Sequence, residues 1–268
     1  MVRRKPAMST NPQRRPALFR ALGDSDPPES VGIGGRPFTR QAVLKHDSWA
    51  ATAVYQGEDG TRVACKFNRT QPLMLLPMGW LGRLLARREL AVLRRMHDVA
   101  GVPKWAGTVT VDDRPVDNAV AHLWIDGRPF TPTRPTDEEF FPRLRRIVEA
   151  LHGRGIAHGD LSKWENILIG DDGRPYLLDY QVCFAPRRPG GWARWCLESL
   201  QAADRFHLYR HWMRVRPGQV PPEIRPERLR PGYIALAARL EPAWRSLRRT
   251  VLGLAGVTTT VGETPGTR

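Results

Sequence analysis

Two β-rich runs separated by a polar turn form the clearest pattern in the N-terminal third of the chain. Residues 53–55 and 62–67 are rich in aromatic, β-branched and small apolar side chains, and residues 56–61 between them are acidic and contain two glycines. This arrangement is typical of a β-hairpin. Residues 101–105 and 119–125 have a similar character, so we expect an antiparallel sheet of about five strands. The pair Asp126-Gly127 then breaks the chain.

Helical periodicity appears in four further stretches. In residues 83–96 apolar positions recur at spacings of three, four and seven, which predicts a helix with one apolar stripe. Glu89 lies within that stripe, and a carboxylate on a buried face needs a partner. Residues 140–152 and 197–209 also have helical spacing. Residues 233–252 have one apolar face bordered by arginines, which fits either a core-packing helix or a basic helix on a membrane surface.

A second hairpin is predicted at Asp172-Gly173, because an Asp-Gly pair between apolar runs favours a two-residue turn. With that turn, Asn166 would lie directly opposite Asp179 at the end of the two strands. Opposed residues of an antiparallel pair have Cα atoms about 4.5–5.5 Å apart, so their side-chain oxygens could hold one cation. A few oxygen ligands with room for water and phosphate suit Mg²⁺. Asp160 would then be a carboxylate beside the metal and a proton acceptor.

Two motifs in this region carry a resemblance to a known family. They are His158-Gly159-Asp160-Leu161-Ser162-Lys163-Trp164-Glu165-Asn166 and Asp179-Tyr180-Gln181. Together they resemble the catalytic loop and metal-binding motif of the protein-kinase-like superfamily. They are most similar to the RIO-type atypical Ser/Thr kinases and the bacterial lipopolysaccharide core (Kdo/heptose) kinases, whose second motif has a D-x-Q form. The resemblance implies a kinase that uses ATP and Mg²⁺, with Asp160 as the catalytic residue and Asn166 and Asp179 as metal ligands.

The same resemblance assigns residues in the N-terminal half. Residues 62–67 resemble the V-A-I-K strand of protein kinases, which places Lys66 at the α- and β-phosphates of ATP with Glu89 as its partner. The alternative for Glu89 is a surface pair with Arg88 or Arg94. The chain would cross between lobes at residues 124–127, where backbone groups of a kinase meet adenine. The implied nucleotide-binding residues are Lys66, Glu89, Ser48, Val54, Ala64, Trp124 and Asp126.

Several features depart from the family pattern. Gly159 replaces an Arg of the catalytic loop, and the interval from Asp160 to Asn166 is one residue longer than in most protein kinases. Residues 47–54 stand where a glycine-rich phosphate loop is expected, but they contain no glycine. No A-P-E triplet follows Gln181, so we expect a reduced peptide-docking platform. The glycine-free loop keeps open a second interpretation, a kinase-fold (pseudokinase) binding module with little or no turnover.

The resemblance and the periodicities together predict an α+β chain with a two-lobed, protein-kinase-like fold. A small antiparallel sheet with one helix would form the first lobe, and the second would be mainly helical. We expect a disordered basic arm over residues 1–36, an N-lobe over 37–126, a C-lobe over 127–254 and a disordered tail over 255–268. Asp204, in the helical residues 197–209, is expected to brace the catalytic loop from below.

Composition limits the partners and the compartment. The 268 residues include 42 Lys and Arg against 27 Asp and Glu, a net charge of +15. An anionic partner is therefore expected: a nucleotide, a phosphorylated glycolipid, an acidic membrane surface or, as the least favoured, nucleic acid. The three cysteines form no C-x-x-C pair, which argues against a zinc site and a disulfide framework. The basic N-terminus is not followed by the apolar segment of a signal peptide, and no stretch reaches the length of a membrane-spanning helix, so we expect a cytoplasmic protein. We also expect a monomer.

The acceptor hydroxyl is left open between a protein Ser/Thr and a sugar of a membrane glycolipid. RIO-type kinases imply the first and lipopolysaccharide core kinases the second. The missing A-P-E triplet, the basic surface and the Trp-rich apolar runs favour the glycolipid. Residues 73–81 could lie at a membrane interface with Trp80 at headgroup depth, or pack beneath the N-lobe. In the first case the protein would contact the inner membrane face peripherally.

Overall fold

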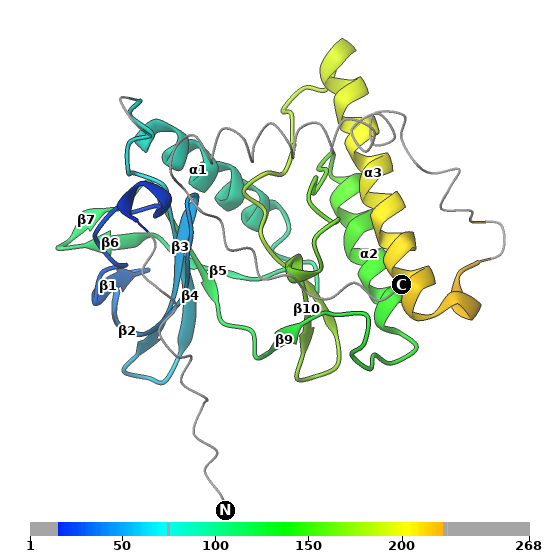
Figure 1. The fold of residues 1–268 in the computed structure, drawn as a ribbon, viewed down its shortest axis with the longest axis horizontal. Coiled ribbons are helices and arrows are strands. Elements are labelled where there is room, and N and C mark those ends of the chain that lie inside the picture. The colour runs from blue at the N-terminus through cyan, green and yellow to red at the C-terminus, as the bar shows by residue number, and fades with distance from the viewer. Residues whose placement is uncertain (1–15, 74–75, 222–223, 225–268) are drawn as a thin grey trace, which may run out of the picture.

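The computed structural model describes residues 16–73, 76–221 and 224. These residues form an α+β structure (Figure 1). A large antiparallel sheet and one helix make up the N-terminal half, and a small sheet and two long helices make up the C-terminal half. The predicted α+β class is therefore confirmed.

The N-terminal half is built on an eight-stranded antiparallel sheet with the strand order β5-β8-β4-β3-β2-β1-β6-β7. The strands are β1 (Ser30–Ile33), β2 (Arg36–His46), β3 (Ala50–Gly57), β4 (Arg62–Asn68), β5 (Trp105–Gly107), β6 (Val109–Val111), β7 (Arg114–Pro115) and β8 (Ala119–Leu123). Strands β2, β3 and β4 are the longest and lie in the middle. The strands β1, β6 and β7 at one edge explain why the sheet is larger than the predicted one. The strand predicted at residues 101–105 begins only at Trp105, because Gly101 has a φ of +90° that interrupts extended backbone.

Side chains of β3 and β4 alternate between two faces of this sheet. Tyr55, Cys65 and Phe67 are buried in one apolar cluster with residues of β1, β2 and β6. Because successive residues of a strand point to opposite faces, Ala64 and Lys66 lie on the other face. The alternation of side chains along β4 therefore buries one face of the strand in the apolar cluster and places Lys66 on the opposite face, toward the next helix, α1.

Helix α1 (Gly79–Arg95) joins the two halves of the structure. Its buried side includes Ala86, Glu89 and Leu93. Leu93 belongs to an apolar cluster that also contains residues of the C-terminal half. The helix begins four residues before the predicted start at residue 83, and Gly82 permits this: a Cβ at Gly82 would lie 2.2 Å from the carbonyl oxygen of Arg69.

The C-terminal half combines two helices with a three-stranded sheet in the order β11-β10-β9. Its elements are β9 (Gly127–Pro129), α2 (Phe140–Gly153), β10 (Ile167–Gly170), β11 (Pro175–Leu177) and α3 (Gly191–Val215), with short 3-10 turns at η2 (Trp164–Asn166) and η3 (Pro217–Gln219). The chain leaves the large sheet at Leu123 and enters the small one at Gly127, at the break seen in the sequence. Both predicted helices are present, and α3 is longer than its periodic segment.

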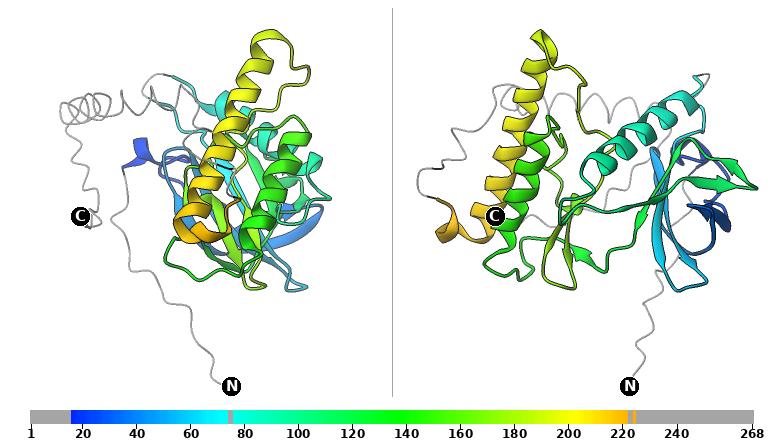
Figure 2. Two further views of the ribbon diagram at one scale, coloured as in Figure 1. Left: turned by 90° about the vertical axis from the view of Figure 1, so that its right-hand side faces the viewer. Right: turned by 180° about the vertical axis from the view of Figure 1, so that it is seen from behind.

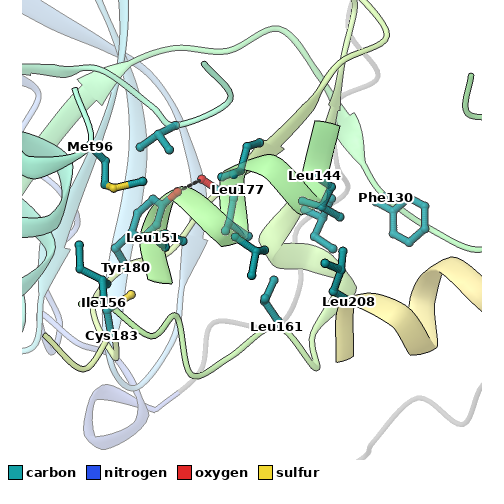
Figure 3. Close-up of a cluster of buried hydrophobic side chains, with 14 of the residues drawn as sticks. Met96, Phe130, Leu144, Leu151, Ile156, Leu161, Leu177, Tyr180, Cys183 and Leu208 are labelled. Atoms are coloured by element: carbon teal, nitrogen blue, oxygen red, sulfur yellow. Dashed lines mark hydrogen bonds between the residues drawn. The ribbon is translucent and has the colours of Figure 1, made fainter. Parts of the chain in front are cut away.

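One apolar cluster holds this half together and extends into α1 (Figure 3). Its buried members include Met96, Phe130, Leu144, Leu151, Ile156, Leu161, Leu177, Tyr180, Cys183 and Leu208. The hydroxyl of Tyr180 donates to the carbonyl of Leu177 at 2.8 Å within it. The cluster therefore anchors Leu161 of the predicted catalytic loop (residues 158–166) and Tyr180 of the second motif in one packed core.

The predicted basic arm over residues 1–36 is wrong from residue 16 onward. Ala17–Phe19 forms a 3-10 turn, η1, and β1 pairs with both β2 and β6. Arg20 is buried and donates to Asp26 and to the ring of His46. The pairing of β1 with β6 and the contact between Arg20 and His46 join residues far apart in the sequence, so local composition did not reveal them. Residues 1–15, the expected helix at 233–252 and the expected tail at 255–268 lie outside the described residues.

The hairpin of β10 and β11 has a different register from the predicted one. Ile167 pairs with Leu177, whereas a two-residue turn would pair it with the next residue. The turn holds three residues instead of two, since the N–H of Gly170 donates to the carbonyl of Arg174 at 2.9 Å. Gly173 takes a φ of +75° there. A three-residue loop with glycine in the left-handed region is a common hairpin connection, and it shifts the pairing by one residue.

The shared core generates a prediction for α1. Leu93 is 1% exposed and Leu84, in the same helix, is 37% exposed. Replacing Leu93 with Ala should lower the free energy of unfolding by about 2–5 kcal/mol, because a cavity is left between the two halves. Leu84→Ala should change it by about 0.5 kcal/mol or less. Urea denaturation followed by circular dichroism measures both, and equal losses would contradict the packing described for α1.

Candidate active site

The ammonium of Lys66 contacts two carboxylates that come from different parts of the chain. Its Nζ lies 3.2 and 3.3 Å from the two carboxylate oxygens of Glu89 on α1, and 2.7 Å from Oδ1 of Asp179, which follows β11. The ion pair between Lys66 and Glu89 predicted from the sequence is therefore present. Glu89 is buried, so its alternative placement at the surface is wrong. One ammonium thus connects β4, α1 and the second motif.

Burial and charge act against each other in this cluster. Burial lowers the pKa of Lys66, but Glu89 and Asp179 outweigh burial, so the pKa of Lys66 lies above its usual value. Burial raises the pKa of Asp179, but the charge and hydrogen bond of Lys66 outweigh it and hold that pKa below its usual value. At Glu89 burial dominates and raises the pKa, against the opposing effect of Lys66. Asp179 is consequently the carboxylate that stays ionised most readily.

The backbone at Asp179 turns its side chain toward Lys66. Asp179 has a φ of +63°, a left-handed conformation that Asp and Asn adopt more readily than most residues. The N–H of the preceding Leu178 donates to the carbonyl of Asn166 at 2.8 Å. Leu178 is therefore the neighbour of Asn166 across the hairpin, and the predicted direct opposition of Asn166 and Asp179 is wrong. The three-residue turn described above is the cause.

Asp160 and Asn166 contact each other in the catalytic loop. Nδ2 of Asn166 donates to the backbone carbonyl of Asp160 at 2.9 Å and to its Oδ2 at 3.2 Å. Nζ of Lys163 donates to the same Oδ2 at 2.6 Å. Because the amide nitrogen of Asn166 faces Asp160, its amide oxygen points away from that residue. The longer interval between Asp160 and Asn166 contains the 3-10 turn η2. Lys163 also belongs to this site, although the sequence did not lead us to assign it a role.

The start of the catalytic loop is held by the buried carboxylate of Asp204 on α3. Its Oδ2 accepts the N–H of His158 at 2.7 Å, and its Oδ1 accepts the N–H of Gly159 at 2.9 Å. Oδ2 also lies 3.1 Å from Nε2 of His152. The brace predicted for Asp204 is therefore confirmed. Gly159 has a φ of +78°, which explains physically why glycine suits the position where the family pattern has Arg.

The buried ring of His158 connects the catalytic loop to the second motif. Its Nδ1 accepts the N–H of Asp160 at 3.3 Å, so in the neutral ring Nε2 carries the proton and donates to the carbonyl of Leu178 at 3.0 Å. The ring also packs edge-on against Tyr180, with centroids 5.4 Å apart. His158 thereby sets the distance between Asp160 and the segment that carries Asp179.

Three small or neutral side chains lie on the same face of the sheet as Lys66. Val54 pairs with Ala64 across β3 and β4, and Ala64 pairs with His122 across β4 and β8. Burial lowers the pKa of His122 to about 4, so its ring is neutral at pH 7. Val54 and Ala64 were predicted site residues. His122 was not, because its place opposite Ala64 follows only from the strand register.

The remaining predicted site residues are engaged in other contacts. Nε1 of Trp124 donates to Asp126 at 3.0 Å, and the other oxygen of Asp126 accepts from Arg62 at 2.6 Å. The hydroxyl of Ser48 donates to the carbonyl of Phe19 at 3.2 Å. The side chains of Trp124 and Asp126 therefore pair with each other at the crossing between the two sheets, and Ser48 ties the turn between β2 and β3 to η1.

The turn between β2 and β3 is closed by its own carboxylate. Oδ1 of Asp47 accepts the N–H groups of Trp49 at 2.8 Å and Ala50 at 3.0 Å. The buried guanidinium of Arg69 donates to the carbonyl of Ser48 at 2.7 Å and to two further carbonyls. The turn is therefore stabilised by Asp47 and Arg69, and its conformation does not depend on glycine.

Comparison with known proteins gives partial likenesses to kinases. No protein-family model matches the chain. A stretch of 47 residues is 47% identical to serine/threonine-protein kinase 16 of Mus musculus and of Rattus norvegicus, covering 16% of this chain and 15% of each relative. Two structures of the Rio2 kinase from Chaetomium thermophilum, one an ADP/Mg²⁺-phosphoaspartate complex, have 16% sequence identity and TM-scores of 0.46 and 0.47. They cover 68% and 73% of this chain, which spans 56% and 57% of theirs.

The brace on the catalytic loop generates a stability prediction. In Asp204→Asn an amide N–H₂ would face the backbone N–H groups that the carboxylate now accepts. We expect the free energy of unfolding to fall by about 1–3 kcal/mol, the cost of leaving buried polar groups unsatisfied. Asp113→Asn, at an exposed turn position with a φ of +58°, is the matched control. Denaturation curves that shift equally for the two variants would show that Asp204 is not the brace.

Proposed function

We propose that this chain is an ATP-dependent kinase that transfers the γ-phosphoryl group of ATP to a hydroxyl acceptor. The observation that supports it best is the single ammonium of Lys66 between Glu89 and Asp179, with Asp160 and Asn166 on the loop that leads into the same hairpin. Residue types, chain order and contacts agree with the motifs of the protein-kinase-like superfamily.

The oxygen atoms of Asn166 and Asp179 fit a Mg²⁺ ion bound together with ATP. Hard oxygen donors suit Mg²⁺, and Lys66 keeps the pKa of Asp179 low. The amide nitrogen of Asn166 is used by Asp160, which leaves its oxygen as the donor atom for a cation. In the described part of the chain no group of three His, Cys, Asp or Glu side chains could hold a metal, so phosphate and water oxygens would complete the ligand set. When bound, the ion would neutralise phosphate charge.

In this proposal each polar residue has a separate task. Lys66, positioned by Glu89, offsets negative charge on the α- and β-phosphates. Asp160 orients the acceptor hydroxyl and accepts its proton, and Lys163 places a positive charge beside the Asp160 carboxylate. Because the transition state of phosphoryl transfer is largely metaphosphate-like, positioning and charge compensation provide most of the catalysis.

For the acceptor we propose either a protein Ser/Thr hydroxyl or a sugar hydroxyl of a lipopolysaccharide-type glycolipid, used by a cytoplasmic monomer with peripheral contact to an anionic membrane. Radiolabelled ATP with Mg²⁺, offered in parallel to a protein mixture and to a purified glycolipid extract, separates the two. Label in either fraction supports the kinase, and the labelled fraction identifies the acceptor class. If the chain bound ATP but transferred no radiolabelled phosphate to either fraction, the proposed kinase activity would be contradicted.

A second function, a kinase-fold binding module without turnover, is favoured by the turn between β2 and β3. The N–H groups of Trp49 and Ala50, which a phosphate loop would offer to ATP, already donate to Asp47. Lys45 pairs with the same carboxylate at 2.7 Å. A carboxylate at this place also repels phosphate, so nucleotide could be held weakly while the rest of the site stays intact.

Asp160→Asn is predicted to abolish phosphoryl transfer and leave ATP affinity within a few-fold of the unmodified chain. The reason is that the proton acceptor is lost while Lys66 and Asp179, which serve the nucleotide, are retained. Single-turnover transfer from radiolabelled ATP and a binding titration measure the two effects. Asp117→Asn, an exposed substitution of the same kind, should behave as the unmodified chain. Transfer by Asp160→Asn at an unchanged rate would remove Asp160 from the mechanism.

Asp179→Asn is predicted to remove the Mg²⁺ dependence of ATP binding. The substitution deletes the charged metal ligand and one of the two carboxylates on Lys66. Thermal stabilisation by ATP should then be the same with Mg²⁺ and with a chelator, whereas the unmodified chain should be stabilised more with Mg²⁺. Full Mg²⁺-dependent stabilisation of Asp179→Asn would show that the metal is held elsewhere.

A further inference from the structure

Large apolar side chains are exposed at the beginning of α1. Leu76 and Leu84 are exposed, and Trp80 is 58% exposed. Packing of residues 73–81 beneath the sheet, one of the alternatives from the sequence, therefore does not account for these side chains. Arg83 and Arg87 lie exposed among them, and Glu89, the only acidic residue of the helix, is buried. We call Leu76, Trp80, Arg83, Leu84 and Arg87 the α1 cluster.

A second group of the same kind lies at the beginning of α3. Trp192 is 75% and Trp195 61% exposed. Arg187 and Arg188 precede them and are exposed as well. The exposed Arg194 lies between the two tryptophans and pairs with Glu198 at 2.8 Å, so that arginine would have to exchange this partner for a lipid phosphate. The first turn of α3 contains no acidic residue. We call Arg187, Arg188, Trp192, Arg194 and Trp195 the α3 cluster.

The beginnings of α1 and α3 lie on the same side of the molecule. In Figure 1 the beginning of α1 and the beginning of α3 are both at the top, and both views of Figure 2 agree. The first turns of α3 also extend beyond the end of α2 on that side. Two segments more than a hundred residues apart in the sequence thus bring exposed Trp and Arg side chains to helix beginnings on the same side of the molecule.

This combination matches the chemistry of an anionic membrane surface. Exposed Trp side chains settle at the level of lipid headgroups, and apolar side chains beside arginines gain from insertion and from attraction to lipid phosphates. A net charge of +15 adds long-range attraction to such a surface. Exposed patches of apolar side chains with polar or charged residues around them often mark interaction sites, whereas single exposed apolar residues are common on any protein. No helix in the described part of the chain is long and apolar enough to cross a bilayer.

We propose that the α1 cluster and the α3 cluster together form a docking surface for an anionic lipid bilayer. Each cluster supplies tryptophan or leucine side chains for insertion and arginines for headgroup phosphates. Two points of contact would fix the orientation of the protein on the membrane, since one apolar core contains residues of α1 and of the C-terminal half. The proposal requires neither nucleotide binding nor turnover, so it stands or falls independently of the proposed kinase activity.

Co-sedimentation of the full chain with vesicles tests this surface. One vesicle type contains phosphatidylcholine alone, and the other contains equal parts of phosphatidylcholine and phosphatidylglycerol, each at low and high salt. We expect binding to the anionic vesicles at low salt and weaker binding at high salt, because salt screens the charge attraction. The double variants Leu76→Ser with Trp80→Ser, Trp192→Ser with Trp195→Ser, and Arg83→Ala with Arg87→Ala should each lose several-fold in affinity.

The matched control is Arg114→Ala with Arg128→Ala, which removes two exposed positive charges from β7 and β9. It should bind as the unmodified chain does, and melting curves should show that all variants are folded. An equal loss in the control would mean that binding follows net charge alone and would overturn the docking surface. Absence of binding by the unmodified chain, or self-association through Trp80, Trp192 and Trp195 in analytical ultracentrifugation, would overturn it as well.

Discussion

The position of Lys66 between Glu89 and Asp179 is the interaction on which the rest of the site depends. A buried ammonium is tolerated only when carboxylates compensate it, and removing one partner of a buried pair costs far more than the pair contributes. Strand β4, helix α1 and the segment at Asp179 must therefore lie close enough for their three charged side chains to be in contact. The alternation of side chains along β4 directs the ammonium of Lys66 to this place, and the buried side of α1 provides the carboxylate of Glu89. The second carboxylate belongs to Asp179, whose backbone is in the left-handed conformation. The shared apolar core keeps these three elements in place.

A second set of constraints places the catalytic loop relative to this cluster. Asp204 holds the backbone of His158, and the His158 ring reaches the segment before Asp179. Asn166 returns to Asp160 through the η2 turn, so the loop is closed at both ends. The loop is thus held by the polar contacts of His158, Asn166 and Asp204, which are buried or partly buried. Hydrogen-bond networks of this kind fix geometry, because a rearrangement would leave a polar group without a partner.

Much of this arrangement could be predicted from local patterns. The stripe in residues 83–96 contained Glu89, and a buried carboxylate called for a cation such as Lys66. Other features could not be predicted, because they depend on contacts distant in sequence or on the conformation of one turn. The third residue in the β10–β11 turn shifted the register and removed the expected opposition of Asn166 and Asp179. The contact between Arg20 and His46, 26 residues further along the chain, helps to hold a segment whose composition suggested disorder.

Calorimetric titration of the unmodified chain with ATP, once with Mg²⁺ and once with a chelator, tests the central claim most directly. In the absence of the ion, the triphosphate would meet the ionised Asp179 and compete with it for Lys66, so binding should be weak. With Mg²⁺ the carboxylate becomes a ligand and the repulsion is removed, so we expect tight binding. Equal affinity in both titrations, or no binding in either, would contradict the assignment of this cluster to Mg²⁺ and ATP.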